Sequence, residues 1–185
     1  MNIAIVGATG NVGRKTLEVL EKKGFSLGNL YLVASSKSAG KKIHFQGKDI
    51  IVSELENFDF SKVKIAFFAA GGKISEKFAE KAAKHCLVID NSSFFRMDPD
   101  VPLIVPQVNS DALNNVKKNI IANPNCSTAQ LVIALKPLHD LFVIKRIVVS
   151  TYQSVSGAGK ASMDELIKQT KLALDGKDIK SENFT

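Results

Sequence analysis

The sequence of 185 residues has little cysteine, no tryptophan and no long apolar run. Two cysteines are too few for the disulfide framework of a small secreted domain. No apolar stretch approaches the ~18 residues that a membrane-spanning helix needs, and the first residues lack the basic and apolar regions of a signal peptide. We therefore expect a cytoplasmic protein with no membrane partner.

The excess of positive charge is not gathered into a basic block. Lysine and arginine number 25 against 18 acidic residues, which gives a formal net charge of +7. The lysines stand among acids, as in Glu76-Lys77 and Glu80-Lys81, and two tyrosines offer little surface for stacking bases. We expect no nucleic-acid partner, and a surface that attracts anionic small molecules.

Short apolar runs alternate with stretches of helical periodicity over most of the chain. The run at 63–70 is almost continuously apolar, as in a strand covered on both faces. Strands that alternate with helices predict an α/β class, with a Rossmann-like, mostly parallel sheet and helices on both faces. The expected strands are 2–6, 29–34, 50–52, 63–70, 86–90 and 120–122. The expected helices are 11–23 (with Val12, Thr16, Val19 and Leu20 on one apolar face), 75–84 and 127–138, the last interrupted late by Pro137.

The pattern changes near residue 140. One long strand is expected within 143–155, and an amphipathic helix over 160–174 with an apolar stripe of Met163, Leu166, Ile167 and Leu174. One strand and one helix cannot cover each other well. We therefore predict two domains, 1–140 and 141–185, of which the second is the incomplete start of an α+β domain.

A glycine-rich turn follows the first expected strand and opens the first expected helix. Gly7 permits the tight turn, Gly10 lets the backbone approach a pyrophosphate, and Gly13 lets helix and strand pack closely. The helix N-terminus offers N–H groups and a positive dipole to phosphates. The sequence predicts a dinucleotide site here, with a plain strand–helix turn as the alternative; its residues are Gly7, Thr9, Gly10, Asn11, Val12 and Gly13.

The end of the second strand indicates which dinucleotide fits. An NAD site places an acid there for the ribose hydroxyls, but this stretch has none. Its three hydroxyls and one cation suit a 2′-phosphate, so NADP is the expected cofactor, and a polar surface loop is the alternative. The residues are Ser35, Ser36, Lys37 and Ser38. Gly71 and Gly72 leave room for the cofactor over the sheet edge, or form a plain turn.

Cys126 lies between an apolar strand and a helix, behind Asn123-Pro124-Asn125. A helix N-terminus favours the thiolate and can bind an oxyanion, so Cys126 is the candidate nucleophile. Cys86 begins an apolar strand and reads as a small buried hydrophobe. A nucleophilic cysteine normally needs a base. The three histidines, His44, His85 and His139, carry no motif and are expected to be structural or solvent-facing.

Taken in order, these motifs resemble those of the aspartate-semialdehyde dehydrogenase family. The segment N-P-N-C-S-T differs from the H-P-G-C of the otherwise similar N-acetylglutamyl-phosphate reductases. The match is collinear over nearly the whole chain and comprises residues 7–13, 36–40, 70–72, 90–98, 105–109, 123–128 and 153–159.

The resemblance implies the reaction of L-aspartyl 4-phosphate with NADPH to give L-aspartate 4-semialdehyde, NADP and phosphate. It implies that Cys126 attacks the acyl phosphate and that Arg96 and Asn125 bind the phosphate group. It implies that Gln153 orients the substrate and that Ser156 and Gly157 approach the nicotinamide. The family serves lysine (through diaminopimelate), threonine, methionine and isoleucine biosynthesis, and no metal site is implied.

Chains of this family run to roughly twice this length, in line with a two-domain enzyme. We therefore expect 1–140 to be the NADP-binding domain with the catalytic cysteine, and 141–185 to begin the catalytic and dimerisation domain of a homodimer. The base and the arginine for the substrate carboxylate are expected outside these residues, so this chain alone should bind NADP but turn over poorly. The alternatives are a naturally truncated, non-catalytic NADP-binding module and another acyl-phosphate reductase, such as an N-acetylglutamyl-phosphate reductase.

Overall fold

The computed structural model describes residues 1–181, which fall into two compact units that meet between Ile147 and Val148. The first unit holds one seven-stranded sheet in the order β3-β4-β2-β1-β5-β6-β7. The strands are β1 (Ile3–Val6), β2 (Leu30–Ala34), β3 (Lys42–Phe45), β4 (Lys48–Glu54), β5 (Ile65–Phe68), β6 (Leu87–Asp90) and β7 (Ile120–Ala122); the α-helices are α1 (Asn11–Lys22), α2 (Gly72–Ala83), α3 (Pro106–Asn109), α4 (Cys126–Phe142) and, in the second unit, α5 (Lys160–Leu174).

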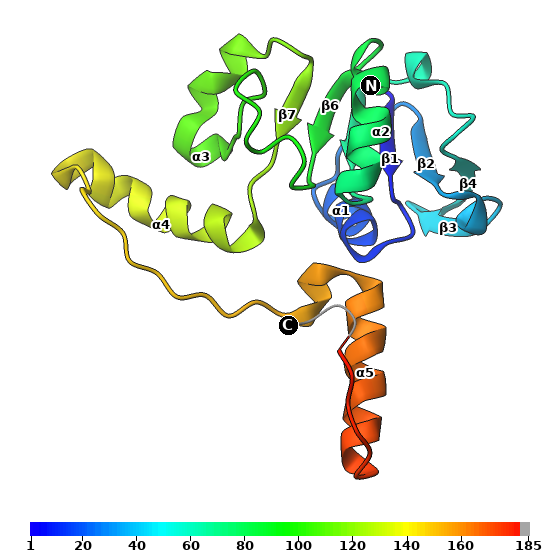
Figure 1. The fold of residues 1–185 in the computed structure, drawn as a ribbon. Coiled ribbons are helices and arrows are strands. Elements are labelled where there is room, and N and C mark those ends of the chain that lie inside the picture. The colour runs from blue at the N-terminus through cyan, green and yellow to red at the C-terminus, as the bar shows by residue number, and fades with distance from the viewer. Residues whose placement is uncertain (182–185) are drawn as a thin grey trace. The chain divides into compact units, whose positions relative to one another are not determined.

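Every strand pair in the sheet is parallel except β3 with β4 (Figure 1). β1 lies at the centre, between β2 and β5. The chain winds outward from β1 through β2 to β4 on one side, then returns to β5 and continues outward through β6 to β7 on the other. This change of direction at β1 and β5 is the topological switch point beside which α/β folds bind ligands.

The sheet is buried on both faces. Successive residues of β1 point to opposite faces, so Ala4 and Val6 join one apolar cluster while Ile5 joins the other. Phe78 of α2 belongs to the first cluster, and Leu17 of α1 belongs to the second. The predicted Rossmann-like sheet with helices on both faces is confirmed.

The buried face of α1 differs from the one predicted. Gly13, Leu17 and Leu20 are its buried residues, whereas Val12 and Val19 are each 46% exposed. Gly13 is pressed against the turn that precedes the helix, and this contact fixes the rotation of α1 about its axis. Residues four and seven positions later then share the inner face.

The strand β3 was not predicted from the sequence. It forms an antiparallel hairpin with β4 through Gln46 and Gly47, which have φ angles of 46° and 77°. Two residues of positive φ make the tight turn that suits the twist of a hairpin. Gln-Gly is a weak signal for this turn, because glutamine rarely adopts positive φ.

The strand expected within 143–155 is wrong. No strand lies between β7 and residue 181, and Val148 and Tyr152 are 81% and 102% exposed. A strand needs a neighbouring strand to satisfy its backbone N–H and C=O groups, and none lies beside these residues. The preceding helix α4 also exceeds its expected length, because it continues past Pro137 to Phe142.

The second unit contains α5 and the segment that follows it. The bounds of α5 are those predicted, but the apolar stripe is wrong. Its buried residues are Ser162 and Glu165, whereas Leu166 and Ile167 are 45% and 54% exposed. Glu165 accepts hydrogen bonds from Gln169 on α5 and from Ser181 near the end of the described chain. These two hydrogen bonds involve the buried end of the Glu165 side chain and link α5 to the segment that follows it. The domain boundary expected at residue 140 stays a prediction.

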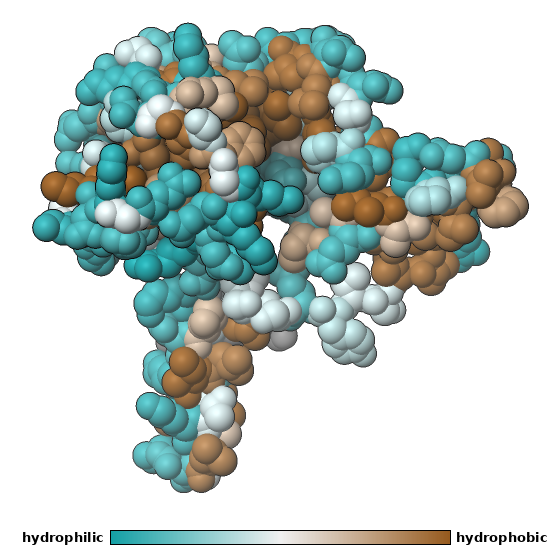
Figure 2. Space-filling model, turned by 180° about the vertical axis from the view of Figure 1, so that it is seen from behind, coloured by the Kyte–Doolittle hydropathy of each residue, from teal (hydrophilic) through white to brown (hydrophobic). Residues whose placement is uncertain are grey.

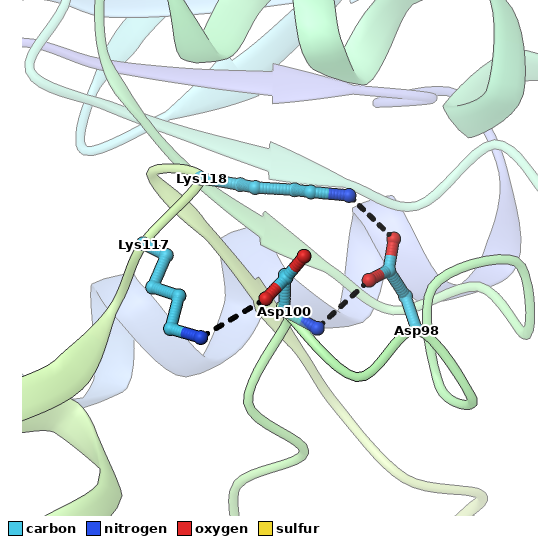
Figure 3. Close-up of polar contacts among 4 residues, drawn as sticks. All are labelled: Asp98, Asp100, Lys117 and Lys118. Carbon is cyan, nitrogen blue, oxygen red and sulfur yellow. Dashed lines mark hydrogen bonds and ion pairs between the residues drawn. The ribbon is translucent and has the colours of Figure 1, made fainter.

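Two ion pairs tie the loop after β6 to the segment before β7 (Figure 3). The Nζ atom of Lys118 lies 2.9 Å from Oδ2 of Asp98, and that of Lys117 lies 3.0 Å from Oδ1 of Asp100. The backbone N–H of Asp100 also donates to Oδ1 of Asp98, over 2.9 Å. We call these four residues the loop clamp.

Candidate active site

The glycine turn is held between β1, the end of β5 and α1. The backbone N–H of Gly7 donates to the carbonyl oxygen of Val33 at the end of β2, over 2.8 Å. Gly7 has a φ of +86°, and a Cβ added there would lie 2.7 Å from the carbonyl oxygen of Ala69. A Cβ added to Gly13 would lie 2.3 Å from the carbonyl oxygen of Gly7. Both positions therefore exclude any side chain, as predicted for a tight turn and a close helix–strand contact.

Gly10 is the N-cap of α1, and its N–H donates to the carbonyl oxygen of Gly7 over 2.9 Å. A Cβ added to Gly10 would approach that oxygen to 3.3 Å, so the constraint here is weaker than at Gly7. Asn11 and Val12 lie in the first helical turn and are exposed. The first-turn N–H groups of any helix lack helical acceptors, which suits this exposed end of α1 to a phosphate.

The serine-rich turn after β2 lies beside the glycine turn. Thr9 Oγ1 donates to Ser38 Oγ over 3.3 Å, which joins two segments 29 residues apart. Ser36, Lys37 and Ser38 form a short 3₁₀-helix capped by Ser35. Ser35, Ser36 and Lys37 are exposed. The structure thus brings together the two segments that the sequence predicts for phosphate and ribose.

A second helix begins at the same edge of the sheet. Gly71, with a φ of +87°, is the N-cap of α2, and Gly72 is its first residue. A Cβ added to Gly72 would lie 3.9 Å from Ser93 Oγ, so the start of α2 neighbours the loop after β6. The carboxyl ends of β1 and β5 thus each lead into a helix N-terminus.

Arg96 is half-buried in the loop after β6 and is held by two backbone carbonyls. Its Nε donates to the carbonyl oxygen of Asn123 over 2.9 Å, and Nη2 donates to that of Asn91 over 3.4 Å. Guanidinium has five N–H donors, so two such contacts fix its plane and leave donors for an anion.

Cys126 is exposed and is the first residue of α4. The side-chain oxygen of Asn125 caps the helix, accepting from the N–H of Ser127 over 3.0 Å and from its hydroxyl over 2.8 Å. The same oxygen accepts from the thiol of Cys126 over 3.6 Å. Cys86 is buried, and desolvation raises the pKa of its thiol to about 11. The exposed thiol is thus the one placed to react with a substrate.

The remaining predicted site residues lie together in the second unit. Ser154 and Ser156 share a hydrogen bond of 2.8 Å between their hydroxyls, and the N–H of Gly157 donates to the carbonyl oxygen of Ser154 over 2.9 Å. A Cβ added to Gly157 would lie 2.6 Å from Nε2 of Gln153. The side chain of Gln153 therefore occupies space that only glycine at position 157 leaves open.

Sequence reasoning missed three polar residues that this edge of the sheet brings together. Asp90 is fully buried at the end of β6, where its carboxylate accepts from the hydroxyls of Ser75 and Ser92 over 2.6 and 2.7 Å. Asn91 and Asn123 follow β6 and β7, and the amide of Asn123 donates to Oδ1 of Asn91. A polar residue directly after an apolar strand was the available signal.

Residues 1–181 contain no group of three or more histidine, cysteine, aspartate or glutamate side chains that could hold a metal ion. None of the helices in this part of the chain is long and apolar enough to cross a membrane.

Known proteins show the same organisation of sequence and fold. Residues 2–116 match the semialdehyde dehydrogenase NAD binding domain, and residues 135–185 match the semialdehyde dehydrogenase dimerisation domain. Aspartate-semialdehyde dehydrogenase 2 of Vibrio cholerae is 52% identical over all of this chain and 55% of its own length. The aspartate-semialdehyde dehydrogenase of Rickettsia bellii is 54% identical over 92% of this chain and 51% of its own.

Solved structures extend the likeness to three dimensions. The crystal structure of Vibrio cholerae aspartate semialdehyde dehydrogenase II complexed with ASA matches with a TM-score of 0.92 and 51% identity, over all of this chain and 55% of its own. The Candida albicans enzyme with NADP matches with a TM-score of 0.62 and 31% identity, over 77% of this chain and 48% of its own. The chain spans about half the length of the relatives it matches. It belongs to the semialdehyde dehydrogenase family.

Proposed function

We propose that this chain is the cofactor-binding and thiol-bearing part of an aspartate-semialdehyde dehydrogenase. The reaction is that of L-aspartyl 4-phosphate with NADPH, giving L-aspartate 4-semialdehyde, NADP and phosphate. The observation that carries the proposal is the exposed Cys126 at the start of α4, three residues beyond the carbonyl to which Arg96 binds. The relatives named aspartate-semialdehyde dehydrogenase support the choice of substrate.

The cofactor would rest on the glycine turn and on the serine-rich turn beside it. The crowding at Gly7 and Gly13 matches the close backbone packing that a pyrophosphate site requires. NADP is favoured over NAD because residues 35–38 supply hydroxyls and the Lys37 cation but no carboxylate. When bound, NADPH supplies the hydride that reduces the acyl group to the aldehyde.

The chemistry of the chain itself centres on Cys126. Its thiolate attacks the acyl carbonyl, the bond between carbonyl carbon and phosphate oxygen breaks, and phosphate leaves with the electron pair. The N-terminal N–H groups of α4 stabilise the tetrahedral oxyanion, and Arg96 and Asn125 bind the phosphate. Cys126 holds the acyl group as a thioester until reduction, after which the thiolate is the leaving group.

The second unit carries the other residues for which we propose a role. Gln153 orients the substrate, and Ser156 and Gly157 approach the nicotinamide. We assign 1–140 to cofactor binding with the nucleophile, and 141–185 to the start of a catalytic and dimerisation domain. The match of 135–185 to a dimerisation domain supports a homodimer. We propose a cytoplasmic location, as expected of an enzyme of amino-acid biosynthesis.

The test measures cofactor binding and acyl transfer on the same preparation. NADP should bind more tightly than NAD, as seen by titration calorimetry, and Lys37→Ala should remove most of that preference. Acetyl phosphate, a small acyl-phosphate probe, should leave an acetyl group on Cys126 that mass spectrometry detects.

Cys126→Ser should abolish this transfer and change NADP binding by no more than about 1 kcal/mol, because the thiol does not hold the cofactor. Cys86→Ser is the matched control and should retain the transfer. NADP binding without acyl transfer would favour the non-catalytic module. In an assay of the full-length protein, turnover with N-acetylglutamate semialdehyde, phosphate and NADP, but not with aspartate semialdehyde, would favour the alternative reductase.

A further inference from the structure

Two asparagines meet across the carboxyl ends of neighbouring strands. Asp90 and Ala122 end β6 and β7 and are partners in the parallel register. Asn91 and Asn123 are the next residues on each strand, so the register brings them side by side. The Nδ2 of Asn123 donates to Oδ1 of Asn91, and both residues are partly buried. We call them the asparagine pair.

The same two residues hold Arg96. Their side chains bind each other, while the carbonyl oxygens of Asn123 and Asn91 accept from Nε and Nη2 of the guanidinium. The guanidinium thus connects the two strand ends, and the hydrogen bond between the side-chain amides is a second connection between them. An unrestrained arginine side chain samples many rotamers, so these contacts confine the plane in which its other donors point.

The asparagine pair is anchored on one side and leads to the nucleophile on the other. On the β6 side, the buried Asp90 carboxylate also accepts from the N–H of Ser92 over 3.1 Å, which fixes the backbone around Asn91. On the β7 side, the buried Pro124 follows Asn123, and the helix with Cys126 begins two residues later. A change in the position of Asn123 would therefore move Arg96 and Cys126 relative to each other.

We propose that Asn91 and Asn123 are positioning residues that set the orientation of the Arg96 guanidinium toward the anion that reacts with Cys126. This inference rests on the proposed function and adds to it the residues that position Arg96. Neither asparagine needs to touch the substrate. Bidentate binding of a phosphate depends on the plane of the guanidinium, so loss of the pair should weaken anion binding while the thiol remains intact.

Alkylation of Cys126 tests the proposal on the chain as it is. Iodoacetate and iodoacetamide attack the same thiolate and differ in one negative charge. The ratio of their rate constants therefore reports the positive charge around the thiol. A change in the reactivity of the thiol or in the stability of the fold affects both rate constants equally and leaves the ratio unchanged. Cys86 is buried and does not interfere. Inorganic phosphate is the second probe and should slow the reaction with iodoacetate.

The variants are Arg96→Ala, Asn91→Ala, Asn123→Ala and the double asparagine variant. We expect Arg96→Ala to lower the iodoacetate-to-iodoacetamide ratio by about tenfold, the size of a lost charge-assisted hydrogen bond. Each single asparagine variant should lower it by about three- to tenfold, and the double variant should lose no more than either single one, because both disrupt one link. Phosphate protection should fall in parallel.

Asn57→Ala is the matched control, because its amide also donates to a side-chain oxygen, that of Glu54, which ends β4 on the opposite side of the sheet from β6 and β7. It should leave the ratio unchanged. If an alanine variant fails to fold, Asn→Ser at the same position keeps a polar group too short to span the pair. Asparagine variants that match Asn57→Ala while Arg96→Ala lowers the ratio would overturn the positioning role. If Arg96→Ala and the unmodified chain have the same iodoacetate-to-iodoacetamide ratio, the proposed anion site itself is overturned.

Discussion

At the scale of single residues, Gly13 carries the sharpest steric constraint in the fold. A Cβ there would meet the carbonyl oxygen of Gly7 at 2.3 Å and Cα of Ala8 at 2.8 Å, and both are backbone atoms that cannot rotate away. Gly13→Ala should therefore lower the free energy of unfolding by about 1–3 kcal/mol, as overpacking does, although alanine favours helices. Urea denaturation followed by circular dichroism measures this loss.

Gly72→Ala serves as the control for that experiment. Gly72 is the first residue of α2, and the nearest atom to an added Cβ there lies 3.9 Å away, in ordinary contact distance. Its urea midpoint should stay equal to that of the unmodified chain or rise. Equal midpoints for Gly13→Ala and Gly72→Ala would contradict the packing account of the glycine turn.

The two cysteines should differ in their rate of alkylation because their thiols differ in exposure to solvent. Cys126 is exposed, whereas Cys86 is 6% exposed and desolvation raises the pKa of its thiol to about 11. At pH 8, iodoacetamide should label one thiol in the folded chain, at Cys126, and a second only after denaturation. Peptide mass spectrometry locates the label, and Cys126→Ser should remove the first without affecting the second.

The sequence indicates single site residues where they lie on local motifs. Gly7, Gly13 and Cys126 were placed from their position between a strand and a helix. The asparagine pair was missed because it depends on the register of β6 with β7, two strands 30 residues apart in the chain. Register follows from packing of the whole sheet, which no local pattern specifies.

At the scale of elements, the loop clamp should make stability depend on acid pH. The hydrogen bond from Lys118 and then that from the Asp100 N–H lower the pKa of Asp98. A carboxyl whose pKa is lowered by folding stabilises the fold above its unfolded pKa of about 4, and that stabilisation is lost as pH falls through the folded pKa. Figure 3 shows the contacts that protonation would weaken.

Asp98→Asn should therefore flatten the loss of stability between about pH 5 and pH 2 relative to the unmodified chain. Urea denaturation at a series of pH values measures it. Lys118→Met should flatten the profile less, since it removes the ion pair but leaves the hydrogen bond from the Asp100 N–H. Parallel profiles for all three chains would show that the clamp contributes nothing to acid stability.

The segment after α4 tests whether an alternating apolar pattern is enough to form a strand. Its alternating residues suit a sheet, yet Ile147, Val148 and Val149 are 52%, 81% and 56% exposed. Without ladder hydrogen bonds, the amides of 144–152 should exchange with deuterium near the rate of an unfolded chain, whereas those of β6 should exchange slowly. Slow exchange over 144–152 would mean that these residues pair with another strand.

The elements that could be predicted are those whose hydrophobic pattern reflects burial inside the same unit. The central strands are apolar because they are covered on both faces, and this holds whatever their order in the sheet. The stripe on α5 and the strand within 143–155 were predicted from the same kind of pattern and are wrong. Their apolar residues, such as Leu174 at 83% exposed, have no counterpart within the described residues to pack against.

At the scale of the whole molecule, exposed apolar residues are concentrated in the segment that matches a dimerisation domain, although others, such as Met97, lie outside it. That match covers 135–185, within which Leu141 and Phe142 are 74% and 75% exposed at the end of α4. Figure 2 shows hydrophobic residues exposed along α4, at the right of the view. Apolar residues flank Lys145 and Arg146 over 141–149, which we call the apolar segment, and they are too many to be isolated surface side chains. The chain spans about half the length of these relatives.

The apolar segment should make this chain associate with itself as its concentration rises. Sedimentation velocity over a range of concentrations should show the weight-average mass climbing above the 20.0 kDa of the monomer. Replacing both Leu141 and Phe142 with glutamine should shift that rise to about tenfold higher concentration, because each side chain contributes about 1.5–3 kcal/mol when fully buried and only part of that is at stake in a loose contact. Ile51→Thr, at an apolar position of β4 that is 60% exposed, is the control and should leave the association unchanged. A monomer at every concentration would contradict an association driven by the apolar segment.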